Sequence, residues 1–194
     1  VNVAHTKVSI LKHAVAFDEK LLLFSDQTQF ILVGGASLTP GNVSVNVTTE
    51  YESLDSVSPV GSGNNVFFGF NKGQFTGVRE MYVESDGETN QGEDITANIP
   101  KYIPSEVFKF ANASNENILV LLSNKTGEKN NLYIYQWFFS QGRRLQSAWH
   151  KWSIGASANT EILNVDFIGT TLFLVVQRSD GVYIETIDCS PAVV

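Results

Sequence analysis

The segment KLLLFSDQTQFILV, residues 20–33, decides the fold of this chain. It joins an apolar run, a polar break and a second run in which apolar and polar residues are interleaved. Apolar runs separated by Asn, Asp, Gly, Ser or Lys are typical of antiparallel β-hairpins. The pattern recurs in three further segments: NVFFGFNKGQFTGVREMYV at 65–83, NILVLLSNKTGEKNNLYIYQWF at 117–138 and TLFLVVQRSDGVYIETID at 171–188.

These hairpins recur at a nearly constant interval. Their first strands start near Leu21, Val66, Ile118 and Leu172, at intervals of 45, 52 and 54 residues. Repeats of about 40–55 residues built on hairpins indicate propeller blades or a stacked β architecture. We therefore predict an all-β fold of antiparallel β-hairpin repeats. It forms one β-rich region over 1–194, with propeller-like blades near 14–34, 65–83, 117–139 and 163–188.

Local patterns predict further elements. The valines at 43, 45 and 47 alternate with polar residues, which indicates a half-buried strand, whereas Ile118–Leu122 is apolar throughout and indicates a strand covered on both faces. The residues from 105 to 111 predict a short helical turn capped by Ser105. The prolines at 100 and 104 bracket a stretch that we expect to be extended. The acidic stretch 84–94 predicts an exposed loop.

Size and composition indicate a globular protein. The 194 residues are 43% hydrophobic and 11% aromatic, and no apolar run is long enough to span a bilayer. The chain begins with Val1 instead of Met and opens on a strand-like segment, so we expect a fragment of a longer chain. Cys189 is the only cysteine, which excludes an internal disulfide and suits a reducing cytoplasm. The formal net charge of −7 argues against tight binding of nucleic acid phosphates.

The sequence contains no recognisable metal site. Its three histidines, His5, His13 and His150, have no ligand spacing. The acidic loop from Asp86 to Ala97 resembles a calcium loop, but Gln91 replaces the required glycine and Ala97 the final acid. We expect no metal, no cofactor and a solvated loop.

Motifs for catalysis are also missing. Gly61-Ser62-Gly63 is a turn and not a nucleophile elbow, and Asn71-Lys72-Gly73 is a hairpin turn and not a phosphate loop. We predict no catalytic residue and no enzyme. A pair of distant carboxylates remains an open alternative, because such pairs hydrolyse the glycosidic bonds of polysaccharides. Arg143-Arg144 is too small a basic cluster to indicate a DNA site.

Several segments resemble, in the same order, the tail tubular protein B family, the nozzle proteins of short-tailed podovirus and autographivirus-type bacteriophages. The resemblance extends from about Lys12 to Ile184. It is carried by Leu23-Phe24-Ser25-Asp26 with Gln29 and Phe30, by Glu93-Asp94-Ile95-Thr96 with Pro100, and by Gln146-Ser147-Ala148-Trp149-His150-Lys151-Trp152.

The resemblance implies a structural protein of the virion tail, assembled in the cytoplasm of the bacterial host. Family members form a hexameric tube below the gatekeeper, tail tubular protein A, and the tube conducts DNA during ejection. The implied partners are other copies of the chain in a ring, the gatekeeper, tail fibres and DNA in transient, non-specific passage. No membrane-spanning segment is expected. The DNA-facing residues are not identified by the sequence.

The residues that carry the resemblance are of structural types. We expect Ser25-Asp26 to form a side-chain-bonded turn and Gln29-Phe30 to begin the returning strand. A similar turn is expected at Asp94 and Thr96, ahead of Pro100. Trp149 and Trp152 are expected to anchor a blade edge or a subunit contact, with packing into the core favoured, and Gln146 precedes them on the same segment.

Overall fold

The computed structural model describes residues 10–17, 20–34, 39, 41–83, 90–140, 143–155 and 159–190. It confirms the all-β prediction, because the helical structure in this part is a single 3-10 turn, Ser114–Glu116. The described part holds no helix with the length and hydrophobicity needed to cross a membrane. The strands are β1 (His13–Phe17), β2 (Lys20–Phe24), β3 (Gln29–Val33), β4 (Ser44–Thr49), β5 (Val60–Ser62), β6 (Asn65–Lys72), β7 (Phe75–Val83), β8 (Asn90–Asp94), β9 (Val107–Ala113), β10 (Ile118–Ser123), β11 (Asn131–Ser140), β12 (Arg143–Ser153), β13 (Glu161–Ile168), β14 (Thr171–Arg178) and β15 (Gly181–Asp188).

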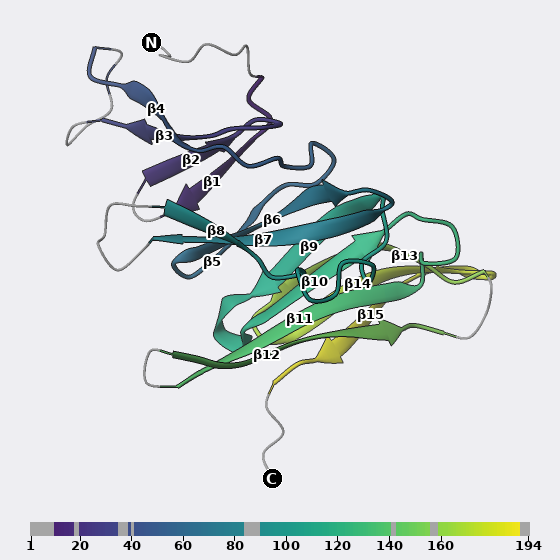
Figure 1. The fold of residues 1–194 in the computed structure, drawn as a ribbon. Helices are drawn as coiled ribbons and strands as arrows, with labels where there is room; N and C mark the ends of the chain where they lie inside the picture. Colours follow the sequence, from purple (N-terminus) through teal and green to yellow (C-terminus); the bar gives the residue numbers. More distant parts are fainter. Residues whose placement is uncertain are drawn as a thin grey trace. The chain divides into compact units, whose positions relative to one another are not determined.

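The strands belong to two compact units, Val1–Tyr102 and Ile103–Val194 (Figure 1). The first unit holds the sheets β1-β2-β3-β4 and β5-β6-β7-β8. The second holds β12-β11-β10-β9 and β13-β14-β15. Each sheet is an antiparallel meander in which neighbours in sequence are neighbours in space. The sheets therefore repeat one topology, with the difference that the last has three strands among the described residues.

The hairpins predicted from the sequence are the second and third strands of each sheet. Leu23 pairs with Phe30 between β2 and β3, and Val120 with Ile134 between β10 and β11. In β6 and β7, Phe70 lies directly opposite Gly77, and an added Cβ at Gly77 would lie 2.2 Å from the Phe70 ring. This glycine is required because the ring covers its backbone.

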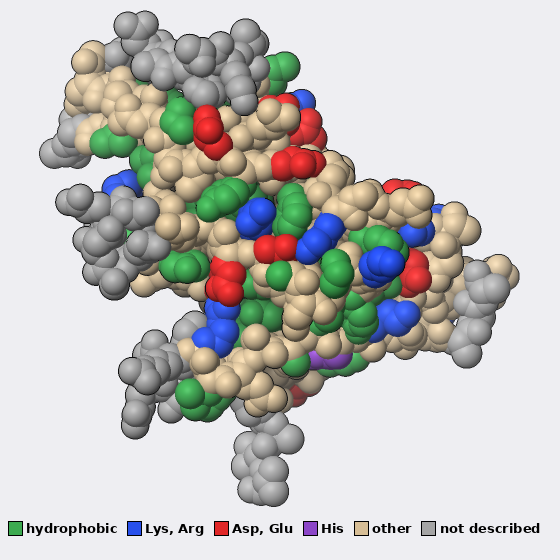
Figure 2. Space-filling model, in the orientation of Figure 1, with side chains coloured by type: hydrophobic (Ala, Val, Ile, Leu, Met, Phe, Trp, Pro, Cys, Tyr) green, Lys and Arg blue, Asp and Glu red, His purple; other side chains and the backbone are tan. Residues whose placement is uncertain are grey.

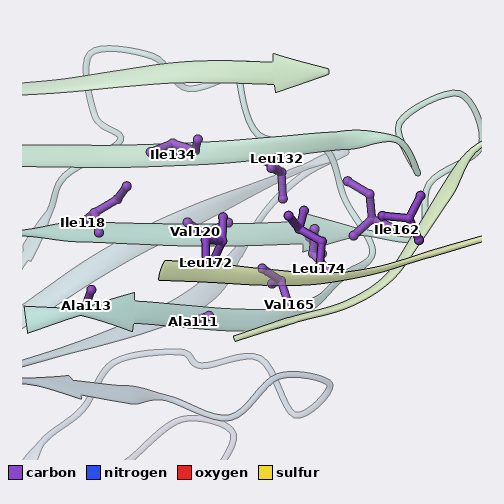
Figure 3. Packing of buried hydrophobic residues seen from close by; sticks show 12 residues of the cluster. Ala111, Ala113, Ile118, Val120, Leu132, Ile134, Ile162, Val165, Leu172 and Leu174 are labelled. Carbon is purple, nitrogen blue, oxygen red and sulfur yellow. The ribbon is translucent and has the colours of Figure 1, made fainter. Parts of the chain in front are cut away.

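Each unit has its own apolar core. In the first unit, Phe17, Leu22 and Phe24 pack with Val66, Phe68 and Met81, so the core joins β1 and β2 to β6 and β7. In the second unit the core lies between the β9–β12 sheet and the β13–β15 sheet, as Figure 3 shows. Its members are Ala111, Ala113, Ile118, Val120, Leu122, Leu132, Ile134, Ile162, Val165, Leu172, Leu174 and Val176.

Three local predictions were wrong. The expected helical turn at 105–111 is largely strand β9, because pairing with the fully buried β10 outweighs a weak cap signal. The stretch between the prolines is not extended: the Ile99 N–H donates to the Thr96 carbonyl (3.0 Å) and the Tyr102 N–H to the Ile99 carbonyl (3.0 Å), which makes successive turns. Of the expected acidic loop, 84–89 lies outside the described residues and the rest is strand β8.

Candidate assembly surfaces

The buried amide of Gln29 joins β3 to a segment that lies about twenty residues further along the chain. Its Oε1 accepts hydrogen bonds from the Thr49 hydroxyl (2.8 Å) and the Tyr51 N–H (3.1 Å), and its Nε2 donates to the Tyr51 carbonyl (2.9 Å). The pairing of β3 with β4 shifts register between Gln29 and Phe30. Gln29 thus satisfies backbone groups that the shift would leave unpaired in a site closed to solvent.

The turn before Gln29 is held by Ser25. The Ser25 hydroxyl donates to the Thr28 carbonyl (2.8 Å) and accepts from the Thr28 N–H (3.1 Å). Asp26 contributes its carbonyl, which accepts from the Ser53 N–H (2.9 Å), while its side chain is exposed. Phe30 begins its strand as predicted and is buried, with 2% of its surface exposed. Of the motif residues here, only Asp26 presents a side chain to solvent.

Asp94 and Thr96 meet in a second side-chain-bonded turn. Asp94 Oδ1 accepts from the Thr96 N–H (2.9 Å) and hydroxyl (2.6 Å), and Lys72 Nζ lies 2.7 Å from Oδ2. Thr96 Oγ1 also accepts from the Val78 N–H (3.2 Å). Burial by itself raises the pKa of Asp94, but the hydrogen bonds from Lys72 and Thr96 outweigh it and hold the pKa below its usual value. Pro100 follows in the exposed succession of turns.

The two tryptophans lie on opposite faces of β12. Trp149 faces an aromatic row, because its ring centroid is 5.0 Å from that of Tyr135, which in turn stacks at 5.3 Å on Trp137. Trp152 packs against the core of the second unit. His150 lies 5.5 Å from Trp152, and burial lowers the pKa of its imidazole. The structure therefore places Trp152 at the core and Trp149 on the opposite face.

Glu128 connects the turn before β11 to strands β11 and β12. Its Oε2 accepts from the Tyr133 hydroxyl (2.6 Å) and the Asn131 amide (2.7 Å), and Lys151 Nζ lies 3.9 Å away. Burial raises the pKa of this carboxyl, but the hydrogen bonds and the nearby lysines outweigh it, so the pKa is lowered. Glu128 could not be predicted from the sequence, because its partners are brought together only by the turn.

The far end of the β11–β12 hairpin extends past its neighbour. The pairing of β10 with β11 ends at Gln136, whereas β11 and β12 continue to pair up to Ser140 and Arg143. On this extension the side chains of Phe138 and Leu145 are 57% and 64% exposed. Gln146, which pairs with Phe138, is exposed as well. We call Phe138, Leu145 and Gln146 the hairpin tip, an exposed and largely apolar surface of which sequence reasoning had singled out Gln146 alone.

The described residues offer little for chemistry. An open pocket of about 400 Å³ in the first unit contains the carboxylates of Asp26, Glu52 and Asp55, but no aromatic side chain lines it. No group of three metal-ligating side chains occurs in the part of the chain that the structure describes. On the face shown in Figure 2, basic and acidic side chains are interspersed among hydrophobic ones. This distribution differs from the continuous basic stripe of a nucleic acid reader.

The family model of the bacteriophage nozzle protein matches residues 1–194, which is the whole chain. The chain belongs to the bacteriophage nozzle protein family. This membership confirms the resemblance stated from the sequence motifs. It identifies the chain as part of a structural protein of the bacteriophage tail.

Two individual proteins are similar to this nozzle family member. Tail tubular protein gp12 of Escherichia phage T7 is 30% identical over 188 residues, which are 96% of this chain and 23% of that protein. The chain thus spans about a quarter of its relative's length. The solved structure of Kluyveromyces lactis Hsv2 (complete loop 6CD) matches with a TM-score of 0.54 at 14% identity, over 87% of this chain and 46% of that one. At this identity the likeness shows the fold alone.

Proposed function

We propose that residues 1–194 form one region of a longer tail nozzle subunit, which assembles into a ring and encloses the path of the ejected DNA. The observation that carries this proposal is the family match over the whole chain. The T7 tail tubular protein supports it over 96% of the chain. The proposed location is the tail of the virion, after assembly in the cytoplasm of the bacterial host.

The repeated topology supports a propeller-like arrangement of this region. Three sheets are four-stranded meanders in sequence order, and the fourth begins in the same way. A meander of this kind is the repeating blade of a propeller. We propose that the predicted segments near 14–34, 65–83, 117–139 and 163–188 each belong to one blade of such an arrangement.

The proposed partners are other copies of the chain, the gatekeeper tail tubular protein A and the tail fibres. The ring is proposed to be a hexamer with the same heterologous contact at each interface. An exposed apolar tip on a long hairpin supports contacts of this kind. The net charge of −7 supports a conduit that repels DNA phosphates and lets the polymer slide.

The proposed subunit works without catalysis. The carboxylate pocket supports this view, because Asp26, Glu52 and Asp55 have no aromatic platform on which a sugar ring could stack. Incubating the protein with host capsular polysaccharide should release no reducing ends. Release of reducing ends that stops in a Glu52→Gln variant would favour the hydrolase alternative.

Immunolabelling of intact virions tests the proposed location. An antibody raised against residues 1–194 should decorate only the tail vertex in electron micrographs. Antibody that has been pre-absorbed with the purified protein is the control and should give no label. If virions stay unlabelled while the same antibody recognises free protein in the lysate, the chain is not an exposed part of the nozzle and the conduit proposal fails.

A further inference from the structure

One face of the β13–β15 sheet packs into the core, and the other is a mixed face that carries several exposed aliphatic side chains. On β14, Leu172, Leu174 and Val176 point into the core and are at most 1% exposed. The alternate residues Phe173 and Val175 are only half-buried. Ile184 of β15 pairs directly with Val175 and is 75% exposed, while Val182 of β15 (58% exposed) and Ile168 of β13 (70% exposed) belong to neighbouring pairs on this face. The direct partners of Phe173 are the polar residues Asp166 and Thr186. An antiparallel sheet can leave one face in water, but a group of aliphatic side chains as exposed as these on that face indicates a contact surface.

The outer side of β15 also lacks a neighbour among the described residues. β15 pairs with β14 over its whole length, from Gly181 to Asp188, and with no other strand that the structure describes. Every second residue of such a strand directs its N–H and C=O away from the sheet. Natural edge strands are protected by lysine, proline or a bulge. β15 contains no lysine, arginine or proline, and its charged residues are Glu185, which forms an ion pair with Arg178, and Asp188 at its end.

We infer that β15 pairs with a fourth strand, and that the outer face of the sheet packs against a further sheet, both supplied by the same polypeptide outside residues 1–194. This inference rests on the proposal that the chain is part of a longer nozzle subunit. The related T7 protein is long enough to supply both, since the matched region is 23% of it. The new surface is defined by Ile168, Phe173, Val175, Val182 and Ile184, which we call the outer face.

The topology favours this occupant over a second copy of the chain. In each of the other three sheets, the strand that pairs with the third strand is the next one in sequence. An antiparallel neighbour needs only a short turn, so closing the loop costs little entropy. A strand from another subunit would bind in a bimolecular step, whose extent depends on the protein concentration. A small contact between two copies would also leave much of the outer face in water.

Hydrogen exchange of the full-length protein, resolved to single amides, tests the pairing. The amides of β15 should all be protected as strongly as those of β14, which pairs on both sides. Exchange of every second β15 amide at the rate of an unstructured peptide would overturn the inference. The experiment is done on the monomer at high dilution and on the assembled ring. Protection that appears only in the ring would overturn it too, because the strand would then come from a second copy.

Substitution of the outer face gives an independent measurement. Ile184→Lys should lower the Tm of the full-length monomer by about 5 °C or more if the position is covered. Ser147→Lys, at an exposed strand position of the same unit, is the matched control and should change the Tm by less than about 1 °C. Equal, small effects of the two substitutions would show that the outer face stays in water. Virion labelling is unaffected by this result, so a failure here is distinct from a failure of the proposed function.

Discussion

Two edge strands of the second unit, β12 and β15, differ in how they present themselves to solvent. β12 presents Lys151 to solvent, and polar residues occupy most of its described exposed positions. β15 has neither lysine nor arginine; its charges are Glu185, which is paired with Arg178, and Asp188, and it exposes Val182 and Ile184. Charged side chains on an edge strand resist pairing with other strands, whereas exposed aliphatic side chains favour it. The sequence of an edge strand therefore indicates whether the edge is meant to remain open.

The same contrast appears in how the two strands are fixed to the core. Trp152 anchors β12 and Ile187 anchors β15, and both are partly buried against the same apolar cluster. Arg178 additionally reaches Glu185 of β15, with its Nη2 2.6 Å from the carboxylate. Both strands are thus fixed by side chains that pack against the core, and they differ only in the side chains that face away from it.

The largest expected effect distinguishes the two faces of β14. Leu174→Ala should destabilise the protein by about 2–5 kcal/mol, because Leu174 is 1% exposed and the truncation leaves a cavity. Val175→Ala removes less volume from a half-buried site, and should cost about 1–2 kcal/mol in the full-length protein if the outer face is covered. Urea unfolding of both variants measures the difference. If Val175→Ala costs close to nothing, the outer face is not covered, and the proposed difference between the β12 and β15 edges is wrong.

The next effect compares the anchors of the two edges. Trp152→Ala should destabilise the protein by about 2–3 kcal/mol and Ile187→Ala by about 1–2 kcal/mol, since each half-buried side chain loses only part of its apolar contact. Thermal unfolding of the variants checks both values. Trp152→Phe is the control for lost volume and should recover more than half of the stability. If Trp149→Ala costs more than Trp152→Ala, the aromatic row holds β12 more firmly than the core does.

A smaller effect depends on pH and concerns the Glu128 contact to β12. The pKa of Glu128 is lower in the folded protein than its usual value of 4.5. Its contribution is therefore fully present above about pH 4.5 and is lost as the pH falls through the lowered pKa. Glu128→Gln should cost less than about 1 kcal/mol at pH 7, because the carboxylate is partly in water, and the cost should shrink below pH 4.

Unfolding midpoints at pH 7, 5 and 3.5 measure this dependence. Glu106→Gln removes one exposed carboxylate of the same unit and controls for the change in net charge. A difference between wild type and Glu128→Gln that stays constant over this range would show that the carboxylate does not hold the hairpin by its charge.

The sequence predicted what depends on neighbours along the chain. The apolar run Ile118–Leu122 is strand β10 with all five side chains buried, and Gln29 begins the returning strand. Ser25 forms the expected turn. Each of these features follows from local periodicity or turn chemistry.

Features set by distant partners could not be predicted in the same way. The hydrogen bonds between the Gln29 side chain and the backbone of Tyr51 form beside the register shift of β3 and β4, which the sequence does not show. Strand β9 forms where a helical turn was expected, because its pairing with β10 outweighs a weak local preference for a helix. Phe138 and Leu145 of the hairpin tip were missed because they are of residue types that usually indicate burial.

The smallest effect on stability is expected at the hairpin tip, where substitutions should reduce ring formation instead. Phe138→Ser and Leu145→Ser should each change the free energy of unfolding by less than about 0.5 kcal/mol, because both side chains are already mostly in water. Native mass spectrometry of the full-length double variant should show monomers at a concentration where the wild type forms rings. Gln136→Ser, an exposed change on the same strand, should leave ring formation intact. Normal rings from the double variant would mean that the tip is not the subunit contact. In that case the ring contacts would have to lie elsewhere in the longer subunit.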